Sequence, residues 1–160
     1  MKKIVVLGIG NILLKDEGIG IRVIEELQKE KFPPQVEIID GGTGGLNLLS
    51  NIDRADVMIV VDCVQGGGEP GDIYEFKPED IDKQNSGWAI KSLHDIGFLD
   101  VLNMSSFMNK KEGPETIIFG VEPLEIESGI GLNEVVEKKI PRLKELVREE
   151  IDKHLKKEGK

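Results

Sequence analysis

The amino-acid sequence predicts an α/β fold, a three-layer sandwich with helices on both faces of a five-stranded and mostly parallel sheet. Short apolar runs alternate along the chain with segments whose apolar residues recur at helical spacing, an alternation typical of such sheets. Residues 57–61 are apolar at every position, as expected for a central strand covered on both faces. The connection that follows is too short for a crossover helix, so we expect residues 72–76 to pair with that strand in antiparallel orientation.

The remaining elements follow from local patterns. Apolar residues three or four positions apart indicate the helices, and alternating or continuous apolar runs indicate the strands. A proline at position 141 is expected to bend the last helix, and the polar residues 78–87 are expected to be mobile. The expected strands are residues 3–7, 36–39, 57–61, 72–76 and 116–121, and the expected helices are residues 17–30, 46–52, 96–108 and 132–151.

Length and composition indicate one acidic domain. The 160 residues suffice for a single core, which we assign to residues 1–155, with residues 156–160 as a solvated tail. A net charge of −9 disfavours nucleic acid as a partner. The single cysteine excludes an intramolecular disulfide and is compatible with a reducing compartment. The apolar run near the N-terminus is too short for a signal peptide or a membrane span, so we expect a cytoplasmic protein without membrane insertion.

Candidate functional residues follow the ends of the expected strands. If the first strand lies between the second and the third, the strand order reverses between the first and third strands, where such folds bind ligands. Glu17 and Asp62 would then face the same crevice, and His94 is one of only two histidines in the chain. Two carboxylates and an imidazole suit a divalent first-row metal, or could hold a water between an acid and a base.

Structural roles compete with this interpretation at each position. Glu17 could complement the helix dipole with Asp16 as the N-cap, and Asp62 could cap the turn that follows its strand. A lone histidine such as His94 is more often structural than a ligand. His154 lies near the chain end and is expected to be solvated.

Two further patterns suggest other chemistry. Cys63 next to Asp62 could be a nucleophile, but adjacent residues of a strand point to opposite faces, which favours packing for Cys63. The turn GGTGG at residues 41–45 could hold an anion through its backbone N–H groups. It lacks the Lys-Ser/Thr ending of a P-loop, and the glycines at 8 and 10 do not complete GxGxxG because position 13 is leucine.

Five blocks of the sequence, in order, resemble those of one enzyme family. Residues 8–20, GIGNILLKDEGIG, resemble the opening signature GxGNxLxxD(D/E)GxG of the hydrogenase maturation endopeptidases. The later blocks that resemble this family are DGGTGG at 40–45, DCV at 62–64 with GEPG at 68–71, SLHD at 92–95 with a glycine at 97, and GVEP at 120–123 with GL at 131–132.

The resemblance implies a mixed five-stranded sheet with one antiparallel strand, and the removal of a C-terminal extension from the large-subunit precursor of a nickel-iron hydrogenase. It also implies that Glu17, Asp62 and His94 bind metal and take part in catalysis. The metal implied is nickel that the substrate presents, rather than an ion permanently bound. The alternative is a non-proteolytic protein that checks or holds nickel with the same three ligands.

Overall fold

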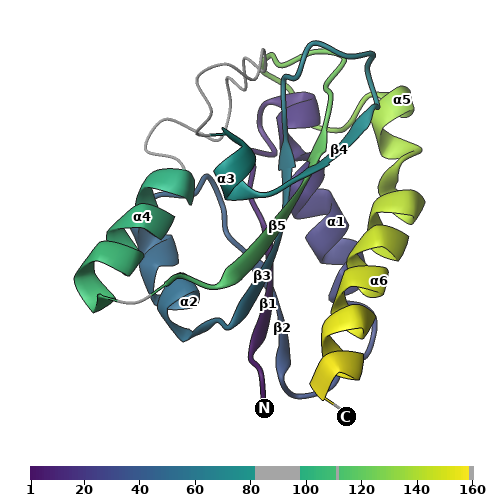
Figure 1. The fold of residues 1–160 in the computed structure, drawn as a ribbon. Coiled ribbons are helices and arrows are strands. Elements are labelled where there is room, and N and C mark those ends of the chain that lie inside the picture. The colour runs from purple at the N-terminus through teal and green to yellow at the C-terminus, as the bar shows by residue number, and fades with distance from the viewer. Residues whose placement is uncertain (82–97, 111, 159–160) are drawn as a thin grey trace.

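The computed structural model describes residues 1–81, 98–110 and 112–158. Its five strands form one sheet in the order β2-β1-β3-β5-β4 (Figure 1). The first four of these strands run parallel, and β4 pairs antiparallel with β5. The strands are β1 (Ile4–Gly8), β2 (Val36–Asp40), β3 (Val57–Cys63), β4 (Ile73–Phe76) and β5 (Glu115–Val121).

Helices cover both faces of this sheet, so the predicted three-layer α/β fold is confirmed. The contacting pair α1 and α6 lies on one face, and the contacting pair α2 and α4 lies on the other (Figure 1). The helices are η1 (Lys15–Gly18), α1 (Ile19–Leu27), η2 (Leu46–Leu48), α2 (Leu49–Arg54), α3 (Pro78–Ile81), α4 (Phe98–Asn109), α5 (Glu134–Glu137) and α6 (Ile140–Glu158).

Two hydrophobic cores lie on the two faces of the sheet, and β3 contributes to both. All seven residues of β3 are buried, as the uninterrupted apolar run predicts. Ile59, Val61 and Cys63 belong to the core beneath α1 and α6, whereas Met58 and Val60 belong to the core beneath α2 and α4. This alternation of sides follows from the pleat of the strand.

Helix α1 packs so closely on the strands that two glycines are required at the contact. A Cβ atom on Gly20 would clash with the carbonyl oxygens of Val61 and Ile9, and one on Gly8 would clash with the carbonyl oxygen of Gly20. Backbone atoms cannot move aside as a side-chain end can, so any side chain at Gly20 would push the helix away from the sheet. The close contact fixes where the chain enters α1, immediately after η1.

The antiparallel strand was predicted with the correct direction but the wrong neighbour. β4 does not pair with β3, because β5 lies between them and pairs with both. The apolar strand β5 has a fully buried carboxyl half and occupies the inner position, while the half-exposed β4 lies at the edge. The order of the strands therefore follows from burial of the more apolar strand and not from proximity in sequence.

Several helical boundaries also differ from prediction. The expected bent helix over residues 132–151 is two helices, α5 and α6, and Pro141 lies in the first turn of α6, where its missing N–H costs no hydrogen bond. Helix α6 continues to Glu158, into the segment expected to be a tail. The expected mobile segment begins instead with the short helix α3, and residues 82–87 lie outside the described part.

The expectation that His154 is solvated is wrong. Its side chain is only 2% exposed and lies on the buried face of α6. Nε2 lies 3.4 Å from Glu150 Oε1, and Nδ1 lies 3.9 Å from Glu115 Oε2. Within residues 1–81, 98–110 and 112–158, none of the helices has the length and apolarity that crossing a membrane requires.

Candidate active site at the carboxyl edge of the sheet

Asp62 occupies the carboxyl end of the central strand. It is the penultimate residue of β3, pairs with Gly120 of β5 and is fully buried. Its Oδ1 accepts a hydrogen bond of 2.7 Å from the backbone N–H of Cys63. The strand was expected to stop before Asp62, but it continues to Cys63, so the sheet itself fixes the backbone that carries this carboxylate.

Glu17 lies in η1, which packs against the carboxyl end of β3. The chain between β1 and η1 is held to that strand by a 3.0 Å hydrogen bond from the N–H of Ile9 to the carbonyl of Val61. Gly10 then passes directly beneath η1, where a Cβ atom would clash with the carbonyl oxygen of Glu17. The side chain of Glu17 is mostly buried. The two predicted carboxylates therefore come from neighbouring elements at one edge of the sheet.

The electrostatics around Cys63 show that several acids gather at this edge. Burial raises the pKa of the Cys63 thiol well above its usual value, and the negative charges of Asp62, Glu17, Asp16 and Glu122 raise it further. The thiol packs in the core beneath α1 and α6 and is protonated at neutral pH. The packing role predicted for Cys63 fits this environment, and a thiolate nucleophile does not.

Asp16 has a role that the sequence did not reveal. It makes no side-chain capping bond at η1; its buried carboxylate instead reaches the loop after β5. Oδ2 accepts bonds from the backbone N–H of Leu124 (2.9 Å) and Glu125 (3.2 Å), and Oδ1 accepts one from the N–H of Asn133 (2.7 Å). The side-chain amide of Asn133 donates a fourth bond to Oδ2 (2.9 Å). Asp16 thus holds the loop of residues 122–133 against η1.

Lys15 adds a second connection between the same two segments. Its ammonium lies 2.9 Å from both Glu125 and Glu127, and these hydrogen bonds raise its pKa above the usual value. A backbone bridge joins Leu14 to Gly129 in parallel orientation. The loop after β5 is therefore tied to the η1 region by side chains and by backbone.

Glu122 organises the loop that follows β3. Its Oε1 accepts hydrogen bonds from the N–H groups of Gly66 (2.9 Å) and Gly68 (3.0 Å) and from the hydroxyl of Tyr74 (2.6 Å). Burial and the bond to this carboxylate raise the pKa of Tyr74 to about 12, so the phenol stays protonated and remains a donor. Asp16 therefore holds the loop after β5, and Glu122 holds the loop that follows β3 and Asp62.

The third predicted residue, His94, lies outside the described residues. Among those that the structure describes, no group of three or more His, Cys, Asp or Glu side chains is arranged to hold a metal ion. The oxygen donors of Glu17 and Asp62 are of the type that divalent first-row metals accept, and an imidazole would complete a mixed N,O set. The metal-binding role of the three residues stays a prediction.

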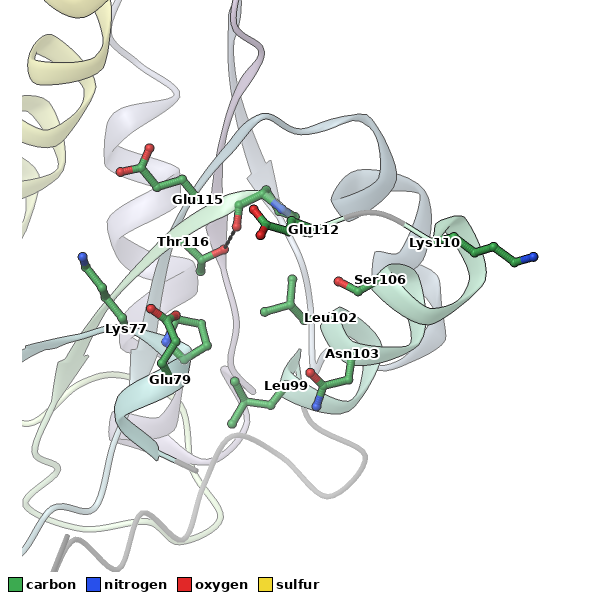
Figure 2. A pocket seen from close by; sticks show the side chains of 13 residues that line it. Lys77, Glu79, Leu99, Leu102, Asn103, Ser106, Lys110, Glu112, Glu115 and Thr116 are labelled. Carbon is green, nitrogen blue, oxygen red and sulfur yellow. Dashed lines mark hydrogen bonds between the residues drawn. The ribbon is translucent and has the colours of Figure 1, made fainter. Parts of the chain in front are cut away.

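A groove of about 940 Å³ lies elsewhere on the molecule, beside α4 (Figure 2). Figure 2 shows Leu99 and Leu102 on one side and Thr116 on the other, with a 2.9 Å hydrogen bond from the Thr116 hydroxyl to the carbonyl of Pro114. Thr116 pairs with Met58 near the amino end of β3, whereas Asp62 lies at the carboxyl end. The groove is therefore distinct from the place of Glu17 and Asp62, which we call the carboxylate site.

Comparison with known proteins identifies the class to which this fold and site belong. The family model HycI, described as hydrogenase maturation protease, matches residues 21–150. This range includes Asp62 and His94 and begins after Glu17. The hydrogenase 2 maturation protease of Escherichia coli K12 is 37% identical over 148 residues, covering 91% of this chain and 88% of that protein.

A solved structure agrees with this classification. The hydrogenase maturating endopeptidase HybD from E. coli superposes with a TM-score of 0.82 and 34% identity, over 95% of this chain and 93% of that one. The chain belongs to the hydrogenase maturation protease family.

Some relatives are longer than this chain. The hydrogenase expression/formation protein HupM of Azotobacter chroococcum mcd 1 is 38% identical over 125 residues, which is 78% of this chain and 59% of that protein. The solution structure of an endopeptidase from E. coli gives a TM-score of 0.75 at 36% identity and covers 91% of this chain and 89% of that one. The chain thus spans about three fifths of the length of HupM.

Proposed function

We propose that the protein is an endopeptidase that removes the C-terminal extension from the large-subunit precursor of a nickel-iron hydrogenase after the precursor has received its nickel. The observation that carries this proposal is the pair of buried carboxylates, Glu17 and Asp62, on adjoining elements of a chain in the hydrogenase maturation protease family. We propose His94 as the third ligand, from the histidine block at residues 92–95.

In this proposal the nickel belongs to the substrate, where it supplies Lewis acidity and marks the position of the cut. Glu17, Asp62 and His94 bind the precursor at its metal and thereby hold the scissile peptide bond in register. A carboxylate of the site takes a proton from the water that attacks the carbonyl carbon, and passes this proton to the leaving amine as the C–N bond breaks. The sheet contributes positioning, because β3 fixes the backbone of Asp62.

The proposal also places this reaction in the cytoplasm. The single cysteine and its protonated, buried thiol are compatible with a reducing compartment. The net charge of −9 supports a protein partner over a nucleic acid.

The nickel dependence provides the direct test. Purified protein is incubated with large-subunit precursor prepared with and without nickel, and the intact mass of the precursor is followed over time. We expect a single loss of mass equal to the extension, in the nickel-loaded sample only. Stable binding of loaded precursor without mass loss would instead support the non-proteolytic nickel-checking protein, and cleavage of nickel-free precursor would exclude nickel as the recognition element.

A Cys63→Ala variant is expected to retain most of the cleavage rate, because the thiol packs in the core and is protonated. Loss of the buried sulfur should lower the free energy of unfolding by about 1 kcal/mol. In the unchanged protein the thiol should resist a thiol-modifying reagent at pH 8 and react only after unfolding, since its pKa is raised. Loss of cleavage in a folded Cys63→Ala protein would restore the nucleophile hypothesis.

A further inference from the structure

Three large apolar side chains are exposed beside the candidate active site. Leu13 is 58% exposed, Leu124 is 54% exposed and Ile130 is 74% exposed. Leu13 belongs to the loop between β1 and η1, and the other two belong to the loop after β5. We call these three residues the apolar rim.

Backbone and side-chain hydrogen bonds hold the apolar rim in place. The N–H of Gly129 donates to the carbonyl of Leu13 (2.9 Å), and the N–H of Lys15 donates to the carbonyl of Gly129 (3.1 Å). These two bonds pair the segment around Leu13 with Gly129, the residue before Ile130. Leu124 is held to the same segment, because its N–H donates to the buried carboxylate of Asp16 (2.9 Å). The apolar rim is therefore a preformed surface, which lowers the entropy cost of binding.

The apolar rim is continuous with the carboxylate site. Leu13 precedes Glu17 by four residues, and Asp16, which anchors Leu124, is the neighbour of Glu17. The same short segment, residues 13–17, therefore carries both Leu13 and Glu17. Exposed apolar side chains that cluster beside a site, in a chain with a net charge of −9, are typical of a contact surface for another protein.

We propose that the apolar rim docks the folded hydrogenase large-subunit precursor, through an apolar patch next to the segment that is cut. This inference depends on the function proposed above. A second copy of the chain fits less well, since two chains of net charge −9 repel each other and three side chains supply little of the 1,200–2,000 Å² or so that a stable dimer buries. A precursor is also bound at Glu17 and Asp62, so the small contact that these three side chains supply is sufficient as an addition.

The experiment compares a double variant, Leu124→Ser with Ile130→Ser, with a matched control. Phe107→Ser removes a side chain that is 85% exposed on α4, on the opposite face of the sheet from α6. Cleavage of nickel-loaded precursor is measured over a range of precursor concentrations. We expect KM to rise about tenfold in the double variant with kcat nearly unchanged, and both parameters to stay near the parent values in the control.

Binding measurements separate this inference from the proposed function. Affinity for nickel-free precursor, measured by biolayer interferometry, should also fall in the double variant, because the apolar contact does not require the metal. If the unchanged protein binds precursor but cleaves none, the proposed function fails, and the affinity difference still decides the role of the rim. Equal affinities for the parent and double variant would overturn the inference, as would an equal loss in the control or a parental dimer that the double substitution dissociates.

Discussion

A Glu17→Gln variant is expected to fold normally and to cleave nickel-loaded precursor at least about 100-fold more slowly than the unchanged protein. Glutamine keeps the size of the side chain but removes the negative charge that a divalent cation prefers. A metal contact contributes several kcal/mol to transition-state stabilisation, and about 1.4 kcal/mol corresponds to a tenfold change in rate. The measurement is the initial rate of precursor cleavage, followed by intact mass.

The matched control for this experiment is Glu25→Gln. Glu25 is an exposed glutamate on α1 whose partner is Arg22 at i−3, so its loss should leave the cleavage rate unchanged. The Tm of the Glu25→Gln control should remain within a few degrees of the parent, as expected for a surface change, and a cooperative thermal transition of Glu17→Gln would show that this variant is folded. A Glu17→Gln protein that cleaves precursor at the parental rate would remove Glu17 from the proposed site.

An Asp16→Asn variant is expected to lose stability, even though the substitution is next to Glu17. The Asp16 carboxylate accepts four hydrogen bonds in a buried position, and an amide would turn donor hydrogens toward N–H groups. Charge-assisted bonds contribute about 1.5–3 kcal/mol each, so a loss of about 3 kcal/mol in the free energy of unfolding is a conservative expectation. Tm should fall by about 6–12 °C for a chain of this length.

Denaturant unfolding and a thermal melt provide these values, with Asp152→Asn as the control because Asp152 is exposed on α6. Backbone amides of residues 124, 125 and 133 should also lose protection from hydrogen exchange, since their N–H groups donate to Asp16. An Asp16→Asn protein with parental stability and protection would show that the charge of Asp16 does not hold this loop. Two adjacent acids are thus expected to affect different properties.

Much of the sheet could be predicted from sequence because burial leaves a strong local pattern. The uninterrupted apolar run of β3 predicted a central strand, and β1 does lie between β2 and β3, as the expected reversal of strand order required. The position of β5 between β3 and β4 was not predictable from connection length alone. It depends on which of β4 and β5 buries more apolar surface, and this difference in burial arises only when the whole sheet is assembled.

In the candidate site, too, features that depend on nearby residues could be predicted, and contacts between residues far apart in the sequence could not. Glu17 and Asp62 were predicted from their places at strand ends, and the structure places both at the carboxyl edge. The anchoring role of Asp16 was missed, because its partners lie 108 to 117 residues further along the chain. Glu122 was missed for a similar reason, since it bonds to Gly66 across 56 residues. Acids that anchor loops and acids that face a substrate look alike in a sequence.

The long reach of Asp16 has a consequence for how the protein is made. During synthesis the N-terminal segment leaves the ribosome first, and β1, η1 and β3 precede every residue that donates to Asp16. Until residues 124–133 have been translated, this carboxylate can remain charged only in water, so η1 cannot settle against the sheet in its final position. The strand β5 that completes the inner sheet is also a late segment. A nascent chain therefore has no assembled carboxylate site until residues 124–133 have been made, and we expect the proposed peptidase to acquire activity only after that point.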